Sequence, residues 1–287
     1  MRSRILSSAV TFFTAASALA QPSPQAPLPP VRIILVGDST VAPKNGWGPG
    51  FSKDVVPEVT FINMAKNGRS SGSYRAEGAW AKVMDVLKSN TNFKATYVLI
   101  QFGHNDQPGK PGRSTNLTNE FPANIRQYVQ DVVSAGAKPV LVTPLTRRMF
   151  KDGKLKNDLV PWADATKKVA LEMGVPVLDL NADSAAAVQK MGPVEANTLA
   201  MAPPPPIVAE SAASGNSVAA PKPTASTNTA STTTNSIAPN NAVERTGETP
   251  PVFDYTHLGP KGSAFFARIV VDELAKAVPD LRPYLKP

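Results

Sequence analysis

The sequence of 287 residues contains no cysteine and only two histidines, His104 and His257. The absence of cysteine excludes disulfide bonds, thiolate catalysis and every zinc site that uses sulfur ligands. Histidine is the side chain that ordinarily titrates close to neutral pH. The candidates for a neutral-pH general base are therefore very few.

Long apolar runs and long charged runs are also missing. No window approaches about 18 uninterrupted apolar residues, so we expect no membrane-spanning helix. The formal net charge is +8, but no run of about five or six basic residues occurs, which does not favour nucleic-acid binding. A basic surface suits an acidic polysaccharide equally well. The hydrophobic fraction of 42% allows a sizeable core and excludes disorder of the whole chain.

The first 20 residues are typical of a secretory signal peptide. Arg2 and Arg4 precede an apolar stretch, and residues 18–20 supply the small side chains that signal peptidase accepts. We expect cleavage after Ala20 and therefore a secreted or periplasmic protein. A buried N-terminal helix is the alternative interpretation.

Five short β-branched runs predict the strands of one sheet. They are Val31–Gly37, Val59–Asn63, Tyr97–Gly103, Pro139–Thr143 and Pro176–Leu180. Near-continuous apolarity in three of them indicates strands covered on both faces, as in a parallel sheet. Helical patterns alternate with the strands, which predicts a single doubly wound α/β domain over residues 31–287. In such sheets the reactive residues lie beyond the carboxyl ends of the strands.

Apolar residues recur at helical spacing in four segments. One is marked by Trp80, Val83, Met84 and Leu87, the next by Ile125, Val129, Val132 and Val133, the third spans residues 157–173, and the last contains Phe265, Phe266, Ile269, Val270 and Leu274. Gly136 and Gly174 are expected to end the second and third helices.

Two segments do not follow this alternation. Residues 21–30 are rich in proline and predict an extended lead-in. Residues from about 193 to 251 contain a proline run and long Ala, Ser, Thr and Asn tracts. This composition buries too little apolar surface to offset the entropy of ordering, so we expect a disordered insertion within the domain.

Four polar motifs lie where the sheet predicts reactive residues. They span residues 37–40, 63–70, 102–106 and 254–259. The first offers the hydroxyl of Ser39, although Asp and Ser are also common helix caps. The second contains Gly68, whose N–H could donate to a developing oxyanion. Asn-Gly is equally a general turn signal.

Asp254 and His257, in the fourth motif, are three residues apart, which places both side chains on one side of a turn. A carboxylate there can accept from one ring nitrogen and leave the other free as a base. A capping Asp followed by an unrelated His is the alternative. In the third motif Asn105 offers an amide donor, and His104 is expected to be structural because His257 has the better-placed carboxylate.

Together with residues 45–48 and 68–74, these motifs resemble the SGNH subgroup of the GDSL hydrolases, and within it the rhamnogalacturonan acetylesterases. The resemblance covers residues 31–180 and 253–277 and omits the expected insertion. It implies a flavodoxin-like three-layer α/β/α sandwich with a five-stranded parallel sheet. It also implies hydrolysis of acetyl esters of rhamnogalacturonan-type pectin, without a metal or an organic cofactor.

The resemblance also assigns roles to individual residues. Ser39 is the implied nucleophile, His257 the general base and Asp254 the group that orients it. The N–H groups of Ser39 and Gly68 and the side-chain amide of Asn105 form the implied oxyanion hole. Each such donor typically contributes about 2.7–4 kcal/mol to transition-state stability.

An acetylated acidic polysaccharide or oligosaccharide is the expected substrate, and we expect a monomer. Arg69, Arg147 and Arg148 lie in loops assigned to the carboxyl edge, where a guanidinium could bind a galacturonate carboxylate. Trp47 could stack on a sugar ring. The alternatives are structurally paired arginines and a tryptophan in the core.

Other functions remain open at this stage. A GDSL-type lipase or thioesterase requires an apolar groove, whereas the edge loops are rich in Asn, Gly, Arg and Lys. An acetyl-xylan esterase shares the chemistry but not the acidic substrate. A non-catalytic carbohydrate-binding protein requires aromatic platforms, and only 7% of the residues are aromatic. A metal-dependent phosphoesterase would use His104, Asp106, Asp254 and His257, which have no established ligand spacing.

Overall fold

The computed structural model describes residues 28–89, 92–219 and 252–287. The expected signal peptide lies outside these residues, as do residues 21–27 of the lead-in and 220–251 of the expected insertion. Within the described ranges, every helix is too short or too polar to cross a membrane.

Five parallel strands form the central sheet in the order β2-β1-β3-β4-β7. The strands are β1 (Val31–Gly37), β2 (Val59–Asn63), β3 (Ala95–Gln101), β4 (Lys138–Val142) and β7 (Val177–Leu178). Val31 of β1 pairs with Val59 on one side and with Ala95 on the other. This is the 2-1-3-4-5 order of flavodoxin-like sheets. The predicted fold class is confirmed.

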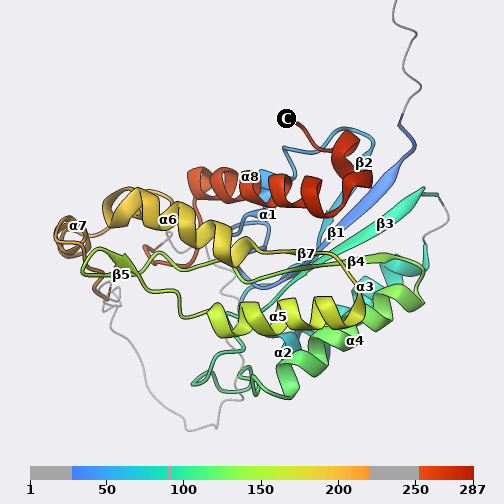
Figure 1. The fold of residues 1–287 in the computed structure, drawn as a ribbon, viewed down its shortest axis with the longest axis horizontal. Helices are drawn as coiled ribbons and strands as arrows, with labels where there is room; N and C mark the ends of the chain where they lie inside the picture. Colours follow the sequence, from blue (N-terminus) through green and yellow to red (C-terminus); the bar gives the residue numbers. More distant parts are fainter. Residues whose placement is uncertain (1–27, 90–91, 220–251) are drawn as a thin grey trace, which may run out of the picture.

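Helices cover both faces of the sheet (Figure 1). One layer consists of α1 (Gly48–Phe51), α6 (Leu180–Asn197), α8 (Pro260–Ala277) and the 3-10 helix η1 (Pro279–Tyr284). The other consists of α2 (Ser71–Ala76), α3 (Ala79–Lys88), α4 (Glu120–Ser134) and α5 (Val160–Met173). Alternate residues of β1 enter the two cores, Ile33 on the α8 side and Ile34 on the α3 side. All seven residues of β1 are buried, which accounts for its largely apolar sequence. The exception, Arg32, donates to the Thr96 hydroxyl at 3.2 Å.

The helix boundaries follow local chemistry. Helix α5 has a proline in its first turn and ends at Gly174, whose φ of 63° is in the left-handed region. In α4, Ile125 and Val129 are buried as predicted. Val133, which marks the same helical spacing in the sequence, is 55% exposed. It lies at the edge of the apolar stripe, where a 3.6-residue period turns it toward solvent.

The prediction of a disordered insertion is wrong for residues 193–219. Helix α6 continues to Asn197 after a kink at Gly192, and α7 spans Pro206–Ala213. Val208 of α7 packs with Ala200, Phe253 and Tyr255 in a small separate core, and the Tyr255 hydroxyl donates to the Val218 carbonyl at 2.8 Å. The composition of residues 193–251 did not predict this order, because half of the small core comes from Phe253 and Tyr255, which follow that segment.

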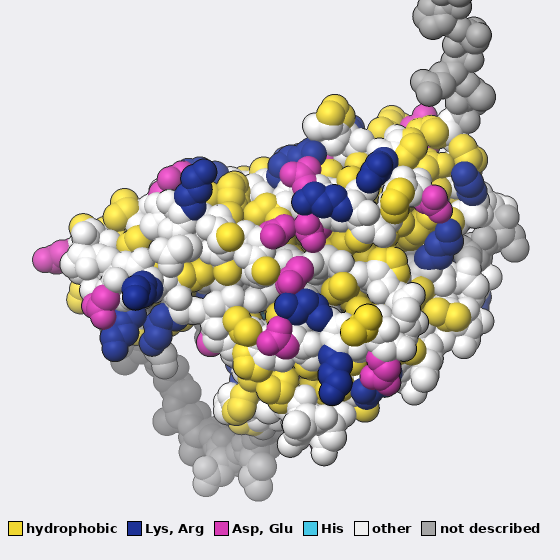
Figure 2. All heavy atoms as spheres, viewed as in Figure 1, with side chains coloured by type: hydrophobic (Ala, Val, Ile, Leu, Met, Phe, Trp, Pro, Cys, Tyr) yellow, Lys and Arg dark blue, Asp and Glu magenta, His cyan; other side chains and the backbone are white. Residues whose placement is uncertain are grey.

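A short hairpin, β5 (Phe150–Lys151) and β6 (Lys154–Leu155), stands beside this segment. Its backbone is joined to the end of α7 by bonds from Gly153 N–H to the Gly215 carbonyl and from Ser217 N–H to the Phe150 carbonyl. On the face shown in Figure 2, Lys and Arg alternate with Asp and Glu and do not gather into one basic patch.

Candidate active site

Ser39 and His257 are in hydrogen-bond contact although 218 positions separate them. Ser39 Oγ lies 2.8 Å from His257 Nε2, and His257 Nδ1 lies 2.7 Å from Asp254 Oδ2. Ser39 lies two residues after the end of β1, whereas the other two residues precede α8. The structure therefore brings the three residues of the expected triad together at the carboxyl edge of the sheet.

The carboxylate of Asp254 is held by three donors. Besides the ring of His257, it accepts the backbone N–H groups of Thr256 at 2.7 Å and His257 at 2.6 Å. Burial opposes the charge on Asp254, but the hydrogen bond and charge of His257 and these two N–H groups lower its pKa to about 2. An ionised carboxylate fixes the proton on Nδ1, so Nε2 faces Ser39 as an acceptor.

Arg148 binds the backbone of residues 254–257. It is fully buried, and its Nη2 donates to the carbonyls of Asp254 at 2.9 Å and His257 at 3.0 Å, while Nη1 donates to that of Thr256 at 3.3 Å. Burial lowers the pKa of Arg148 to about 10 against the attraction of Asp254, so the side chain is still protonated at neutral pH. The expected substrate-binding role of Arg148 is wrong because its donors are buried against the backbone.

The downstream end of the segment is also fixed. Leu258 N–H donates to the Asn45 carbonyl at 2.9 Å, and Gly259 N–H donates to the Leu199 carbonyl at 3.0 Å. A Cβ on Gly259 would lie 2.5 Å from the Ala200 carbonyl oxygen, so only glycine allows this approach. The base is thus held by backbone contacts on both sides of His257.

A chain of buried hydrogen bonds lies beneath the Ser39 loop. Trp47 Nε1 donates to Gln101 Oε1 at 2.9 Å, and Gln101 Nε2 donates to Thr40 Oγ1 at 2.6 Å. Thr40 in turn donates its hydroxyl at 2.7 Å and its N–H at 2.9 Å to Asp38 Oδ1. Trp47 has no exposed surface, so the prediction that it stacks on a sugar ring is wrong.

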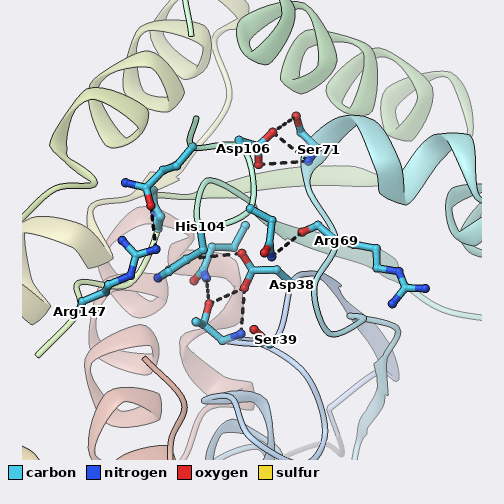
Figure 3. A network of polar contacts seen from close by, with 12 residues as sticks. Asp38, Ser39, Arg69, Ser71, His104, Asp106 and Arg147 are labelled. Atoms are coloured by element: carbon cyan, nitrogen blue, oxygen red, sulfur yellow. Dashed lines mark hydrogen bonds and ion pairs between the residues drawn. The ribbon is translucent and has the colours of Figure 1, made fainter. Parts of the chain in front are cut away.

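His104 lies on the far side of the same carboxylate (Figure 3). It is 2% exposed, and its Nδ1 is 3.4 Å from Asp38 Oδ2. Burial lowers the pKa of His104 and outweighs the attraction of Asp38, so the ring is neutral at pH 7. This surrounding suits the structural role expected for His104.

The expected oxyanion donors follow three neighbouring strands. Gly68 has a φ of 73°, a conformation that favours glycine. Among the described residues, the N–H groups of Ser39 and Gly68 have no acceptor and are available to a ligand. Asn105 Nδ2 donates to the Arg69 carbonyl at 3.1 Å, which ties the third loop to the second.

Asp106 also connects the loop after β3 to the loop after β2, through several hydrogen bonds. Its carboxylate accepts the N–H of Ser71 at 3.1 Å and the hydroxyls of Ser71 at 2.6 Å and Thr115 at 2.9 Å (Figure 3). Burial raises the pKa of Asp106 to about 6, although these hydrogen bonds oppose the rise. Asp106 therefore fixes the first residue of α2 and, with it, the loop that contains Gly68.

The other two predicted arginines differ in position. Arg69 donates to Glu77 at 2.8 Å, and its side chain points away from Ser39 in Figure 3, so the structure does not support a substrate contact. Arg147 stays at the rim of the site. It donates to Asp158 at 2.7 and 2.8 Å and to Gln107 at 2.7 Å.

Sequence reasoning did not assign a role to several residues of the site. Gln101 carried a signal, because a polar side chain that ends a buried apolar strand needs a partner. Arg148 was assigned a substrate contact, and no sequence signal indicated its structural role, since its acceptors lie 106–109 positions later in the chain. Lys110 and Arg113 were not singled out either, because they lie in a loop made mostly of polar residues.

The residues of the metal alternative do not form a common site. Asp254 is bonded to His257, Asp106 to Ser71, and His104 faces Asp38. Across residues 28–89, 92–219 and 252–287, no group of three or more His, Cys, Asp or Glu is arranged to hold a metal ion.

A Ser–His–Asp chain at the carboxyl edge of a flavodoxin-like sheet defines a serine-dependent hydrolase. The profile of the GDSL-like lipase/acylhydrolase family matches residues 35–198. The chain belongs to this family, and the protein is a serine-dependent carboxylic ester hydrolase.

Similar curated proteins share one activity in their names. The rhamnogalacturonan acetylesterase RhgT of Bacillus subtilis (strain 168) is 35% identical over 178 residues, which cover 59% of this chain and 73% of that protein. The probable rhamnogalacturonan acetylesterase YesY of the same strain is 31% identical over 168 residues, covering 56% of this chain and 75% of that protein.

A solved structure supports the fold. The crystal structure of the Bacillus subtilis protein YxiM aligns with a TM-score of 0.59 and 20% identity. The alignment covers 86% of this chain and 56% of that chain, so the protein spans little more than half of YxiM.

Proposed function

We propose that the protein is a secreted carbohydrate acetylesterase that removes acetyl groups from rhamnogalacturonan-type pectin through an acyl-enzyme on Ser39. The observation that carries the chemistry is the 2.8 Å contact between Ser39 Oγ and His257 Nε2, with Asp254 behind the ring. The substrate class is supported by relatives named rhamnogalacturonan acetylesterases.

The first half of the reaction acylates the serine. Ser39 Oγ attacks the acetyl carbonyl carbon while its proton moves to His257 Nε2, and the carbonyl π electrons move onto oxygen. The resulting oxyanion accepts from the N–H groups of Ser39 and Gly68 and from the amide of Asn105. Asp254 stabilises the imidazolium that forms.

The second half releases acetate. The tetrahedral intermediate collapses, the bond to the sugar oxygen breaks, and that oxygen leaves with the proton from His257. A water molecule then gives a proton to Nε2 and attacks the acetyl-Ser39 ester. Collapse of this second intermediate returns the proton to Ser39 Oγ and frees acetate.

Secretion and the acidic substrate rest on the sequence. Residues 1–20 have the composition of a cleavable signal, and plant cell-wall polysaccharide is encountered outside the cell. The formal charge of +8, which becomes +6 when Arg2 and Arg4 are removed with the signal, favours approach to a polyanion. Fractionation of an expressing culture, followed by N-terminal sequencing of the exported protein, tests whether the mature chain begins at Gln21.

Replacement of the nucleophile tests the chemistry. We expect Ser39→Ala to remove turnover of 4-nitrophenyl acetate and of acetylated rhamnogalacturonan, because no other hydroxyl in the described structure contacts His257. Ser52→Ala, at an exposed serine, is the matched control and should retain wild-type rates. Full activity of Ser39→Ala would exclude this mechanism.

Two further measurements define the reaction. An organophosphonate should label one peptide, the one that contains Ser39, and Ser39→Ala should prevent the labelling. Acetate release from acetylated rhamnogalacturonan, acetyl-xylan and a short lipid ester should be fastest with the first. A clear preference for the lipid ester would assign the protein to the lipase branch of its family instead.

A further inference from the structure

Three basic side chains lie at the rim of the site: Lys110, Arg113 and Arg147. Arg113 Nη1 donates to the Gly68 carbonyl at 3.3 Å, so its guanidinium is in contact with the loop that supplies an oxyanion donor. Arg147 is fixed by Asp158 and Gln107. Two of the three cations therefore have defined positions next to the reaction centre.

Lys110 differs from Arg113 and Arg147 in the environment of its charged group. No hydrogen bond or ion pair involves Lys110 Nζ among the described residues, although the side chain is half-buried. Burial and the positive charges of Arg147 and Arg113 lower its pKa, and Asp38 and Asp158 only partly oppose them. A like-charged group held close to two arginines destabilises the free protein, and a bound anion relieves that repulsion.

The loop that carries Lys110 is built to hold this position. Lys110 N–H donates to Ser114 Oγ at 2.9 Å, and Ser114 Oγ donates to the Gln107 carbonyl at 2.8 Å. The N–H groups of Arg113 and Ser114 both donate to the Lys110 carbonyl. The next residue, Thr115, is anchored to Asp106 through its hydroxyl at 2.9 Å. The backbone of the turn that carries Lys110 and Arg113 is therefore fixed before a ligand binds.

The available charge exceeds what the rim itself can neutralise. Asp158 pairs with Arg147 but not with Lys110 or Arg113, and it is the one carboxylate that the structure places in an ion pair within this group. Asp38 is fully buried behind His104 and cannot reach the surface. The rim therefore keeps an excess of positive charge beside Gly68.

The geometry points to Lys110 and Arg113 as a subsite that binds a uronate carboxylate of the acetylated polysaccharide. This inference rests on the proposed function, because it places the acetyl group at Ser39 and a carboxylate of the same polysaccharide at the rim. Arg113 supplies planar donors and Lys110 a point charge, and both are partly removed from solvent, which strengthens a charge-assisted bond. Arg147 contributes positive charge, but its own donors are occupied.

Paired substrates test the subsite. Acetylated rhamnogalacturonan oligosaccharides are compared with the same oligosaccharides whose carboxyl groups have been methyl-esterified. We expect Lys110→Met to lower kcat/KM for the free-acid substrate about tenfold relative to the methyl ester, mainly through KM. The ratio between the two substrates is the measured quantity, so a general loss of activity cancels. Lys110→Gln is a second variant if Lys110→Met does not fold.

A control separates a local contact from long-range attraction. Lys82→Met removes the same charge from an exposed position on α3 and should leave the ratio unchanged. An equal effect of both substitutions, or no effect of Lys110→Met on the ratio, would overturn the subsite. Wild-type turnover of 4-nitrophenyl acetate and phosphonate labelling of Ser39 are measured in parallel. If these fail, the esterase mechanism fails; if they succeed while the ratio stays constant, only the subsite is wrong.

Discussion

Arg148 Nη2 bridges the carbonyl oxygens of Asp254 and His257, at 2.9 and 3.0 Å. The two acceptors are the first and last residues of the turn that presents the base to Ser39. A buried guanidinium in the loop between β4 and β5, more than 100 positions earlier in the chain, therefore closes this turn. The position of the base depends on that contact as well as on the start of α8.

Replacement of Arg148 should lower the rate constant more than substrate affinity. In Arg148→Met three carbonyls lose their donor, the turn relaxes, and we expect kcat to fall about 10- to 100-fold with KM little changed. Arg148→Lys keeps the charge but cannot donate to three oxygens in a plane, so its kcat should be intermediate. Arg126→Met, which breaks an exposed ion pair with Glu172, is the control.

The readouts for Arg148 are steady-state kinetics with 4-nitrophenyl acetate and the rate at which a phosphonate labels Ser39. Both should decline together, because both need the base in place. Thermal unfolding measures the loss of stability, for which unpaired buried carbonyls predict about 1–3 kcal/mol. A folded Arg148→Met protein with an unchanged labelling rate would contradict the positioning role.

Asp254→Asn should reduce kcat by about 10²- to 10⁴-fold. The amide of Asn can place its NH₂ group against the ring, which favours the tautomer with the proton on Nε2, and it cannot stabilise the imidazolium. KM for the small ester should change little, since Asp254 faces the ring and not the substrate. Kinetics of this variant beside Asp280→Asn, a change at an exposed carboxylate, provide the measurement. A loss of less than about threefold would be incompatible with Asp254 as the orienting group.

Asp106 should make stability depend on pH between about 4 and 6. Its pKa is raised from 3.8 to about 6 by burial, so the folded protein binds this proton more tightly than the unfolded chain does. Stability from this group is therefore greatest below about pH 4 and is lost as the pH rises through 6, by up to about 3 kcal/mol. Urea unfolding of the wild type and of Asp106→Asn across this range measures the difference. Parallel pH profiles of the two proteins would show that Asp106 is not perturbed.

Trp47→Phe distinguishes a core tryptophan from a sugar platform. The change removes the N–H that bonds Gln101 Oε1 and leaves a buried acceptor unpaired, which predicts about 1–3 kcal/mol lower stability. KM for acetylated oligosaccharides should not rise. Denaturant unfolding and saturation kinetics of the same preparation supply both quantities. A higher KM with unchanged stability would restore the stacking role.

Much of the fold could be predicted because its signals are local. Both β1 and β2 were predicted with their observed bounds, since β-branched and other apolar residues predominate in each run and polar residues follow it. The ends of the other three strands differ by one to two residues. The polar residues that follow the strands predicted the location of the site, because parallel strands present their carboxyl ends at one edge of the sheet. Asp254 and His257 were predicted as a pair because three residues of one turn keep them together.

The roles of Arg148, Trp47 and Lys110 were decided by tertiary structure. A sequence states that an arginine or a tryptophan lies near a strand end, but not whether it turns toward solvent or into the core. For Arg148 and Trp47 that choice depends on acceptors 54 to 109 positions away, whose distance is set only when the layers pack. The ordered structure of residues 193–219 could not be predicted for the same reason, because Val208 packs against Phe253 and Tyr255, which lie far along the chain. The sequence by itself determined which chemical groups line the edge of the sheet; packing decided which of them face a substrate.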